Sequence, residues 1–241
     1  MKNFINKKIV LINILILILL ITVNCKYDKY TYEQRYFDIP LKEEYINAIK
    51  LLSEKKYDQA LLKFNNLYIN YPNNIYTEKI LISLIYLNYL EHNFLIVLEL
   101  IDEFIQLYDH SAFMSYIFYI KIITEISLDT NSKIQNLFKI NRKNCNPFYT
   151  QLAINDTKIF FKKYPNSIYI PFLKKKLIHM NQRIKNFDLN IIKFLYQKKK
   201  YISTINRCLI FLKNSPYNDI NTNIIKKILN NSLNKLKLNN F

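Results

Sequence analysis

Apolar residues recur at helical spacing along the chain from Leu41 to the C-terminus. Neighbouring apolar positions stand three or four residues apart, and the long runs lack the strict alternation of a half-buried strand. This spacing places apolar side chains on one face of a helix, where they can pack against a neighbour. The pattern therefore predicts an all-α protein over residues 41–241.

One short segment interrupts the helical pattern at regular places. Residues 71–76 read Tyr-Pro-Asn-Asn-Ile-Tyr, residues 164–169 read Tyr-Pro-Asn-Ser-Ile-Tyr, and a weaker copy, Ser-Pro-Tyr-Asn, stands at 215–218. Proline has no backbone N–H and cannot continue the hydrogen-bond ladder of a helix. Each copy therefore predicts the end of a helix.

A small or modest residue stands twelve positions before each of these prolines. The pairs are Ala60 with Pro72, Ala153 with Pro165 and Thr204 with Pro216, and Val97 with Asp109 shows the same offset without a proline. An aromatic residue comes three positions earlier in three of the four cases, at Tyr57, Phe94 and Tyr201. This arrangement resembles the tetratricopeptide (TPR) repeat, a helix–turn–helix unit of about 34 residues. In that repeat the small residue lets two helices approach closely, and the aromatic fills the gap at their turn.

The repeats predict a TPR solenoid of about five helix pairs. Their expected bounds are 41–72, 75–109, 113–165, 168–199 and 201–241, the last with a short final helix. A polar excursion at 129–147 interrupts the third pair, and the charged, tyrosine-rich residues 25–40 form a tether without a helical stripe. We therefore distinguish N-terminal repeats over 41–112 from C-terminal repeats over 113–241.

The N-terminus is typical of an export signal. Lys2, Lys7 and Lys8 precede an apolar run over residues 9–23. A helix of that length spans about 22 Å, short of the roughly 30 Å of a bilayer core, which favours a signal peptide over residues 1–24. Cys25 follows at once and is the expected lipid-attachment residue of a bacterial lipoprotein. The preceding Thr-Val-Asn differs from the usual Leu-small-Gly/Ala, so an uncleaved signal anchor remains the alternative; both tether the chain to a membrane outside the cytoplasm.

The composition excludes several kinds of site. The chain has no glycine, so phosphate-binding loops, dinucleotide-binding turns and the GxSxG nucleophile elbow cannot be built. Left-handed helix ends must use another residue, and asparagine is the expected substitute.

The formal charge of +17 suggests nucleic-acid binding as one alternative function. However, only 4 of the 35 basic residues are arginine. Lysine and asparagine enrichment with arginine and glycine depletion indicates an AT-rich genome, as in reduced bacterial symbionts. We therefore attribute most of the charge to codon bias, and an export signal argues against a nucleic-acid partner.

The sequence offers no constellation for catalysis, metal binding or a cofactor. His92, His110 and His179 are scattered, and neither CxxC nor HExxH occurs. Cys145 and Cys208 could form a disulfide in an oxidising compartment, but two unpaired thiols, with Cys208 buried, are the favoured reading. No nucleophile–base pair stands out, so we expect the protein not to be an enzyme.

Short motifs across the chain resemble the BamD family, the lipoproteins of the bacterial outer-membrane β-barrel assembly (Bam) complex. The matching residues are the second repeat over 84–107, Tyr116 and Tyr119, Arg142 and Pro147, the segment 164–169, Arg183, Tyr201, and Asn206 with Arg207. The departures are Asp109 for a proline, Asn144 and Asn146 for acidic residues, Lys199 for a turn glycine, and a shorter C-terminal helix.

The resemblance implies a scaffold without enzymatic activity or cofactor on the periplasmic face of the outer membrane. Proteins of this family hold the periplasmic POTRA domains of BamA through their C-terminal repeats. They bind incoming unfolded outer-membrane proteins through their N-terminal repeats, and other Bam lipoproteins are further partners to consider.

Two sets of candidate site residues follow from the resemblance. The expected BamA-side residues are Arg207, Asn206, Arg183 and Arg142. The expected substrate-binding residues are Tyr45, Tyr57, Tyr86 and Tyr89. The alternative is packing between helices for the tyrosines, a solvated salt bridge for Arg207, and pinning of the insertion for Arg142. The lysines at 174–176 form either a solvated helix face or a contact with anionic lipid or BamA.

A second function also fits a TPR lipoprotein of the cell envelope. A peptidoglycan-associated coordinator of cell division would share the export signal and the repeats. Recovery of BamA with the membrane-anchored protein distinguishes the two functions.

We expect the mature chain to begin at Cys25 and to carry an added lipid mass, because the apolar export segment ends directly before this residue. Intact-mass spectrometry of the chain extracted from membranes measures both features. Retention of residues 1–24 would instead show an uncleaved signal anchor.

Overall fold

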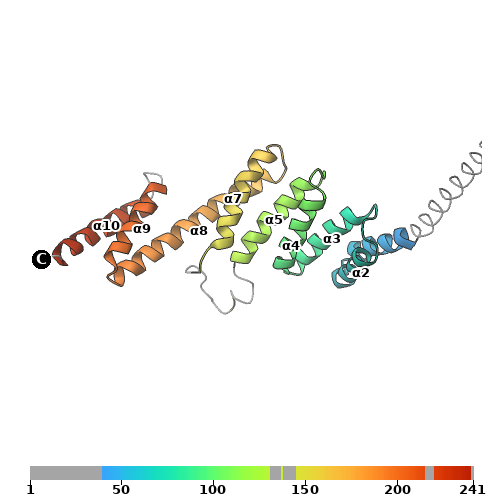
Figure 1. Cartoon of the computed structure of the whole chain (residues 1–241), viewed down its shortest axis with the longest axis horizontal. Helices are drawn as coiled ribbons and strands as arrows, with labels where there is room; N and C mark the ends of the chain where they lie inside the picture. The colour runs from blue at the N-terminus through green and yellow to red at the C-terminus, as the bar shows by residue number, and fades with distance from the viewer. Residues whose placement is uncertain (1–39, 131–136, 138–144, 215–219, 240–241) are drawn as a thin grey trace, which may run out of the picture. The chain divides into compact units, whose positions relative to one another are not determined.

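The computed structural model describes residues 40–130, 137, 145–214 and 220–239 (Figure 1). Within these residues every regular element is a helix and no strand occurs. The helices are one over residues 40–53, α2 (Tyr57–Asn70), α3 (Thr77–Leu90), α4 (Phe94–Leu107), α5 (Met114–Asp129), α7 (Phe148–Lys163), α8 (Ile170–Gln197), α9 (Tyr201–Asn214) and α10 (Ile220–Asn239). The predicted all-α, TPR-like fold class is confirmed. The chain divides after Leu87 into two compact units.

The four anchor residues predicted from the sequence are all fully buried. They are Ala60 on α2, Val97 on α4, Ala153 on α7 and Thr204 on α9. Thr204 is polar, but its hydroxyl donates to the Lys200 carbonyl at 2.8 Å, so no hydrogen-bonding group is left unpaired by its burial. The small anchors therefore stand where the repeat pattern requires close helix packing.

The same turn closes three helices, whether or not a proline is present. The N–H of Tyr71, Tyr108 and Tyr164 donates to the carbonyl four residues earlier, at 3.1, 2.9 and 2.8 Å. Asn74, Ser111 and Ser167 then accept a backbone N–H from two residues further on, as in Asx and Ser/Thr turns. Asp109 occupies the proline position of the middle copy. The side-chain acceptor and the repeated aromatics accompany this turn even where the proline is missing.

Left-handed residues close three other helices, but they are not the asparagines we expected. Lys55, His92 and Lys199 have φ of 59°, 61° and 56°. Each donates its N–H three residues back, while the next residue donates five residues back, which is the Schellman motif. Of the four left-handed residues in the described chain, only Asn73 is an asparagine. The expectation was wrong at the other three, because the Schellman hydrogen bonds hold whichever residue stands at that position.

The segment 168–199, expected to form a helix pair, is largely one continuous helix. α8 runs for 28 residues, with Pro171 in its first turn, where proline is tolerated. It packs against α7 and α9, and α10 packs against α8 and α9. The last helix, expected to be short, has 20 residues.

The second unit, from Asn88 onward, contains two hydrophobic clusters that share α8. One cluster combines Ile122 of α5 and Phe160 of α7 with Leu173 and Met180 of α8. The other combines Leu189 and Ile192 of α8 with Cys208, Phe211 and Ile225 of α9 and α10. Figure 1 shows α8 running from its contact with α7 to its contact with α9. The helix therefore belongs to both clusters.

We expect Lys55→Gly and Lys199→Gly each to stabilise the fold by about 0.5–1 kcal/mol. The left-handed conformation costs a residue with a Cβ roughly 1–2 kcal/mol, and the entropy lost by ordering glycine offsets part of that gain. Thermal unfolding measures the change. As a matched control, Lys227→Gly in the exposed interior of α10 should destabilise by about 1 kcal/mol. A loss of stability in all three variants would contradict the explanation.

Candidate partner-binding groove

A groove of about 720 Å³ lies between α7, α8 and α9. Its walls include Gln151, Ile154 and Lys158 from α7, Ile184, Lys185 and Asp188 from α8, and Arg207, Ile210 and Phe211 from α9. The three helices meet here because α8 is continuous between the two clusters. Each wall contributes both apolar and polar side chains.

Arg207 and Asp188 form an ion pair across the groove. Nη2 of Arg207 donates to Oδ1 of Asp188 at 2.9 Å, and the side chains remain 41% and 31% exposed. An exposed ion pair contributes little to stability, typically about 0–1 kcal/mol. A guanidinium has five N–H donors in a fixed fork. Arg207 therefore keeps hydrogen-bonding capacity for a partner while Asp188 orients it.

The groove is cationic with an apolar wall. Lys158, Lys185 and Arg207 line it against one acidic residue, Asp188. Phe211 is buried, whereas Ile210 is 58% exposed. This combination suits a segment that presents a carboxylate beside an apolar side chain.

Asn206 lies on the outer face of α9 rather than in the groove. Positions 202, 206 and 209 share one helix face, and Ile202 and Leu209 on it are exposed. Asn206 is also exposed. Asn206 thus lies on the outer face of α9, whereas its neighbour Arg207 lies in the groove.

Comparison with known proteins shows which family this chain belongs to. The family model described as "Outer membrane lipoprotein", YfiO, matches residues 38–240. The chain belongs to the YfiO family of outer membrane lipoproteins. This confirms the resemblance drawn from the motifs, and the matched range includes all the groove residues.

Several relatives carry the name outer membrane protein assembly factor BamD. The chain is 34% identical to the one from Buchnera aphidicola subsp. Acyrthosiphon pisum, over 75% of this chain and 68% of the relative. It is 27% identical to the one from Vibrio cholerae, over 74% of each chain. It is 23% identical to the one from Rickettsia prowazekii, over 82% of this chain and 73% of the relative.

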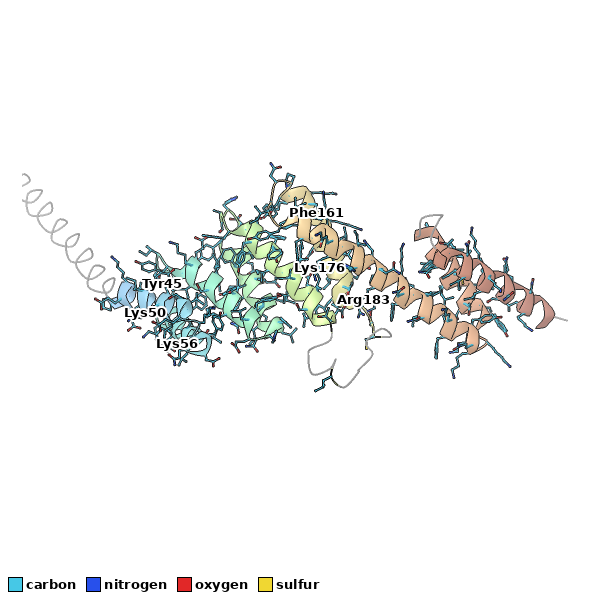
Figure 2. All side chains as sticks on the ribbon, turned by 180° about the vertical axis from the view of Figure 1, so that it is seen from behind. Tyr45, Lys50, Lys56, Phe161, Lys176 and Arg183 are labelled. Atoms are coloured by element: carbon cyan, nitrogen blue, oxygen red, sulfur yellow. The ribbon has the colours of Figure 1, made fainter. Side chains whose placement is uncertain are left out.

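Arg183 lies outside the groove of this YfiO-family chain, at a contact between α8, α7 and α5 (Figure 2). Its Nε donates to Oγ1 of Thr150 at 3.1 Å, and its Nη2 lies 4.0 Å from Oδ1 of Asp129. Asp129, which is buried, accepts the N–H and the hydroxyl of Thr150 at 2.6 and 2.7 Å. Arg183 thus ties three helices together. Arg142 and Cys25 lie outside the described residues.

A second buried charge cluster joins α5 and α7. Nζ of Lys121 lies 2.5 Å from Oδ2 of Asp156 and 3.7 Å from Oε1 of Glu125, which is only 2% exposed. Burial, reinforced by the Asp156 charge, raises the pKa of Glu125 to about 8. Burial alone would lower the pKa of Lys121, but the hydrogen bond to Asp156 raises it overall. At neutral pH, Glu125 is therefore mostly protonated, and Asp156 is the ionic partner of Lys121.

The tyrosines predicted to bind substrate pack against other aromatic rings in two of four cases. Tyr45 stacks on Tyr76 with centroids 4.5 Å apart, and burial, with Tyr76, raises its pKa. Tyr89 lies 5.8 Å from the ring of Phe94. Tyr57 is half-buried, and Tyr86 is 36% exposed. Of the four, Tyr86 offers the most accessible ring.

The two cysteines of the described chain are unpaired, as favoured from the sequence. Cys145 is exposed and Cys208 is buried, and burial raises the pKa of the Cys208 thiol to about 11. Among the described residues, no group of three or more His, Cys, Asp or Glu side chains could hold a metal ion. None of the described helices combines the length and apolarity needed to cross a membrane.

We expect Glu125→Gln to stabilise the fold at pH 8 by about 1–3 kcal/mol and to leave it nearly unchanged at pH 4.5. The pKa of Glu125 rises from 4.5 to about 8 on folding, so between these values the folded chain binds more protons than the unfolded chain. Stability must then fall as pH rises, and glutamine removes this dependence. Denaturant unfolding across this pH range measures it; parallel pH profiles for both proteins would refute the assignment.

Proposed function

We propose that this chain is a non-enzymatic scaffold of outer-membrane protein assembly. The names of its relatives supply the process, and membership of an outer membrane lipoprotein family supports the compartment. The observation that carries the proposal is the groove between α7, α8 and α9, a cationic and partly apolar surface that contains Arg207. Such a surface suits a protein partner rather than a reaction.

The C-terminal repeats, residues 113–241, hold the periplasmic POTRA domains of BamA at this groove. Arg207 binds a carboxylate of the partner, Ile210 and the buried Phe211 receive an apolar side chain, and Asn206 extends the contact over the outer face of α9. Arg183 acts indirectly, because its links to Asp129 and Thr150 hold α8 in place. Arg142 remains a candidate contact from the insertion.

The N-terminal repeats, residues 41–112, bind unfolded outer-membrane proteins. Tyr86 is the first residue to test, because its ring is the most exposed of the four candidates. Tyr45, Tyr57 and Tyr89 act mainly through packing between helices. The chain works on the periplasmic face of the outer membrane, anchored by lipid at Cys25. The relatives' names favour this role over that of a cell-division coordinator.

We expect Arg207→Ala to reduce BamA recovered with the membrane-anchored chain roughly tenfold, as loss of a central interface arginine commonly costs more than 1 kcal/mol. Affinity purification from membranes with quantitative detection of BamA measures this. The melting temperature should barely change, because the lost ion pair is exposed. Lys213→Ala, on the same helix outside the groove, is the matched control and should leave recovery unchanged.

Asp188→Asn separates a binding role of Arg207 from an internal one. If Arg207 binds a partner carboxylate, removing the competing charge of Asp188 should preserve or raise BamA recovery. If Arg207 serves only its pair with Asp188, both variants should lose BamA equally. Unchanged recovery with Arg207→Ala would remove the groove from the interface.

A further inference from the structure

The hairpin formed by α7 and α8 is unusually cationic. The 31 residues from Thr157 to Phe187 include seven lysines and one arginine but no acidic residue. The acids on either side are already paired, Asp156 with Lys121 and Asp188 with Arg207. Both flanking acids therefore pair with basic residues outside the hairpin.

Five of these lysines lie close to the turn between the two helices. They are Lys162, Lys163, Lys174, Lys175 and Lys176. All stand within about two helical turns of residues 164–169, an axial rise of roughly 10 Å. The ammonium group of Lys163 lies 5.1 Å from the centroid of the Phe118 ring. That of Lys176, labelled in Figure 2, lies 5.3 Å from the centroid of the Phe172 ring. Within the described chain, no ion pair involves any of the five.

The tip of this turn presents apolar side chains to solvent. Ile168 is 83% exposed and Phe172 is 43% exposed. Contacts with α5 fix the turn. The rings of Tyr169 and Tyr119 stack with centroids 4.1 Å apart, and the hydroxyls of Ser167 and Ser115 lie 2.9 Å apart. Ile168 is thus fixed in an outward position.

The equivalent turn at 71–76 supplies an internal comparison. Ile75 is as exposed as Ile168, at 79%. However, the nearest lysine before it, Lys63, pairs with Glu44, and Glu78 and Lys79 in the next helix carry opposite charges. Exposed isoleucine therefore recurs at these turns, whereas the surrounding positive charge is specific to the α7–α8 turn.

We propose that the α7–α8 turn, with its five lysines, binds an anionic phospholipid surface. Lysines are attracted to acidic headgroups and their alkyl stems can lie along the interface, while exposed apolar side chains enter the acyl boundary. A polyanion without an acyl phase would satisfy the lysines but not Ile168 and Phe172. Since the family consists of outer membrane lipoproteins, a membrane surface is within reach. The inference does not rest on the proposed assembly role.

Quenching of a fluorophore by lipid-bound quencher tests this contact in the full chain. The dye is attached through Asn166→Cys, beside Ile168, in a Cys145→Ser background; the same chain without Asn166→Cys gives the background from other thiols. The chain is reconstituted into vesicles with or without phosphatidylglycerol, the remainder being phosphatidylcholine. We expect strong quenching with phosphatidylglycerol. Roughly half or more of this quenching should be lost when the lipid is omitted or when the salt concentration is raised to 0.5 M.

Two variants and one control decide the outcome. Lys162→Glu/Lys174→Glu/Lys175→Glu should abolish the quenching, and Ile168→Ser, which changes no charge, should weaken it. Lys213→Glu/Lys227→Glu/Lys235→Glu carries the same charge change on α9 and α10 and should leave it intact. Equal quenching in both vesicle types, or equal loss in both triple variants, would overturn the proposal. BamA recovery is measured separately, so failure here leaves the proposed function standing.

Discussion

The continuity of α8 is the constraint on which the groove depends. Its first half packs Leu173 and Met180 against α5 and α7, and its second half packs Leu189 and Ile192 against α9 and α10. One rigid helix thereby fixes α7 and α9 relative to each other and opens a groove between them. Asp188 stands between the two clusters and faces Arg207. A break within α8 would uncouple the two walls of the groove.

Two arginines singled out by the same family motifs occupy physically different places. Arg183 is largely buried and contacts Thr150 of α7 and Asp129 of α5. Its removal would leave the buried Asp129 carboxylate without its cation, which would destabilise the fold. Arg207 is more exposed, and its partner Asp188 is also solvated. Stability therefore depends on Arg183, whereas Arg207 is available for recognition.

Sequence patterns identified the repeats because local chemistry determines them. The aromatic–Asn/Ser turn and the small anchors depend on residues close together in the chain, and all four anchors are buried. The continuity of α8 was missed because a fixed repeat length was imposed on 168–199, although no helix-stopping proline stands between Pro171 and Lys199. The groove was only partly found, through Arg207; Lys158, Asp188 and Ile210 come from three helices, and only tertiary packing brings them together.

Site-specific photo-crosslinking in native membranes tests the central claim most directly. A photoreactive residue at position 210, on the exposed wall of the groove, is compared with one at position 230, exposed on α10. We predict a crosslink to BamA from position 210 and none from position 230. Crosslinking to BamA from position 230 alone, with none from the groove, would contradict it.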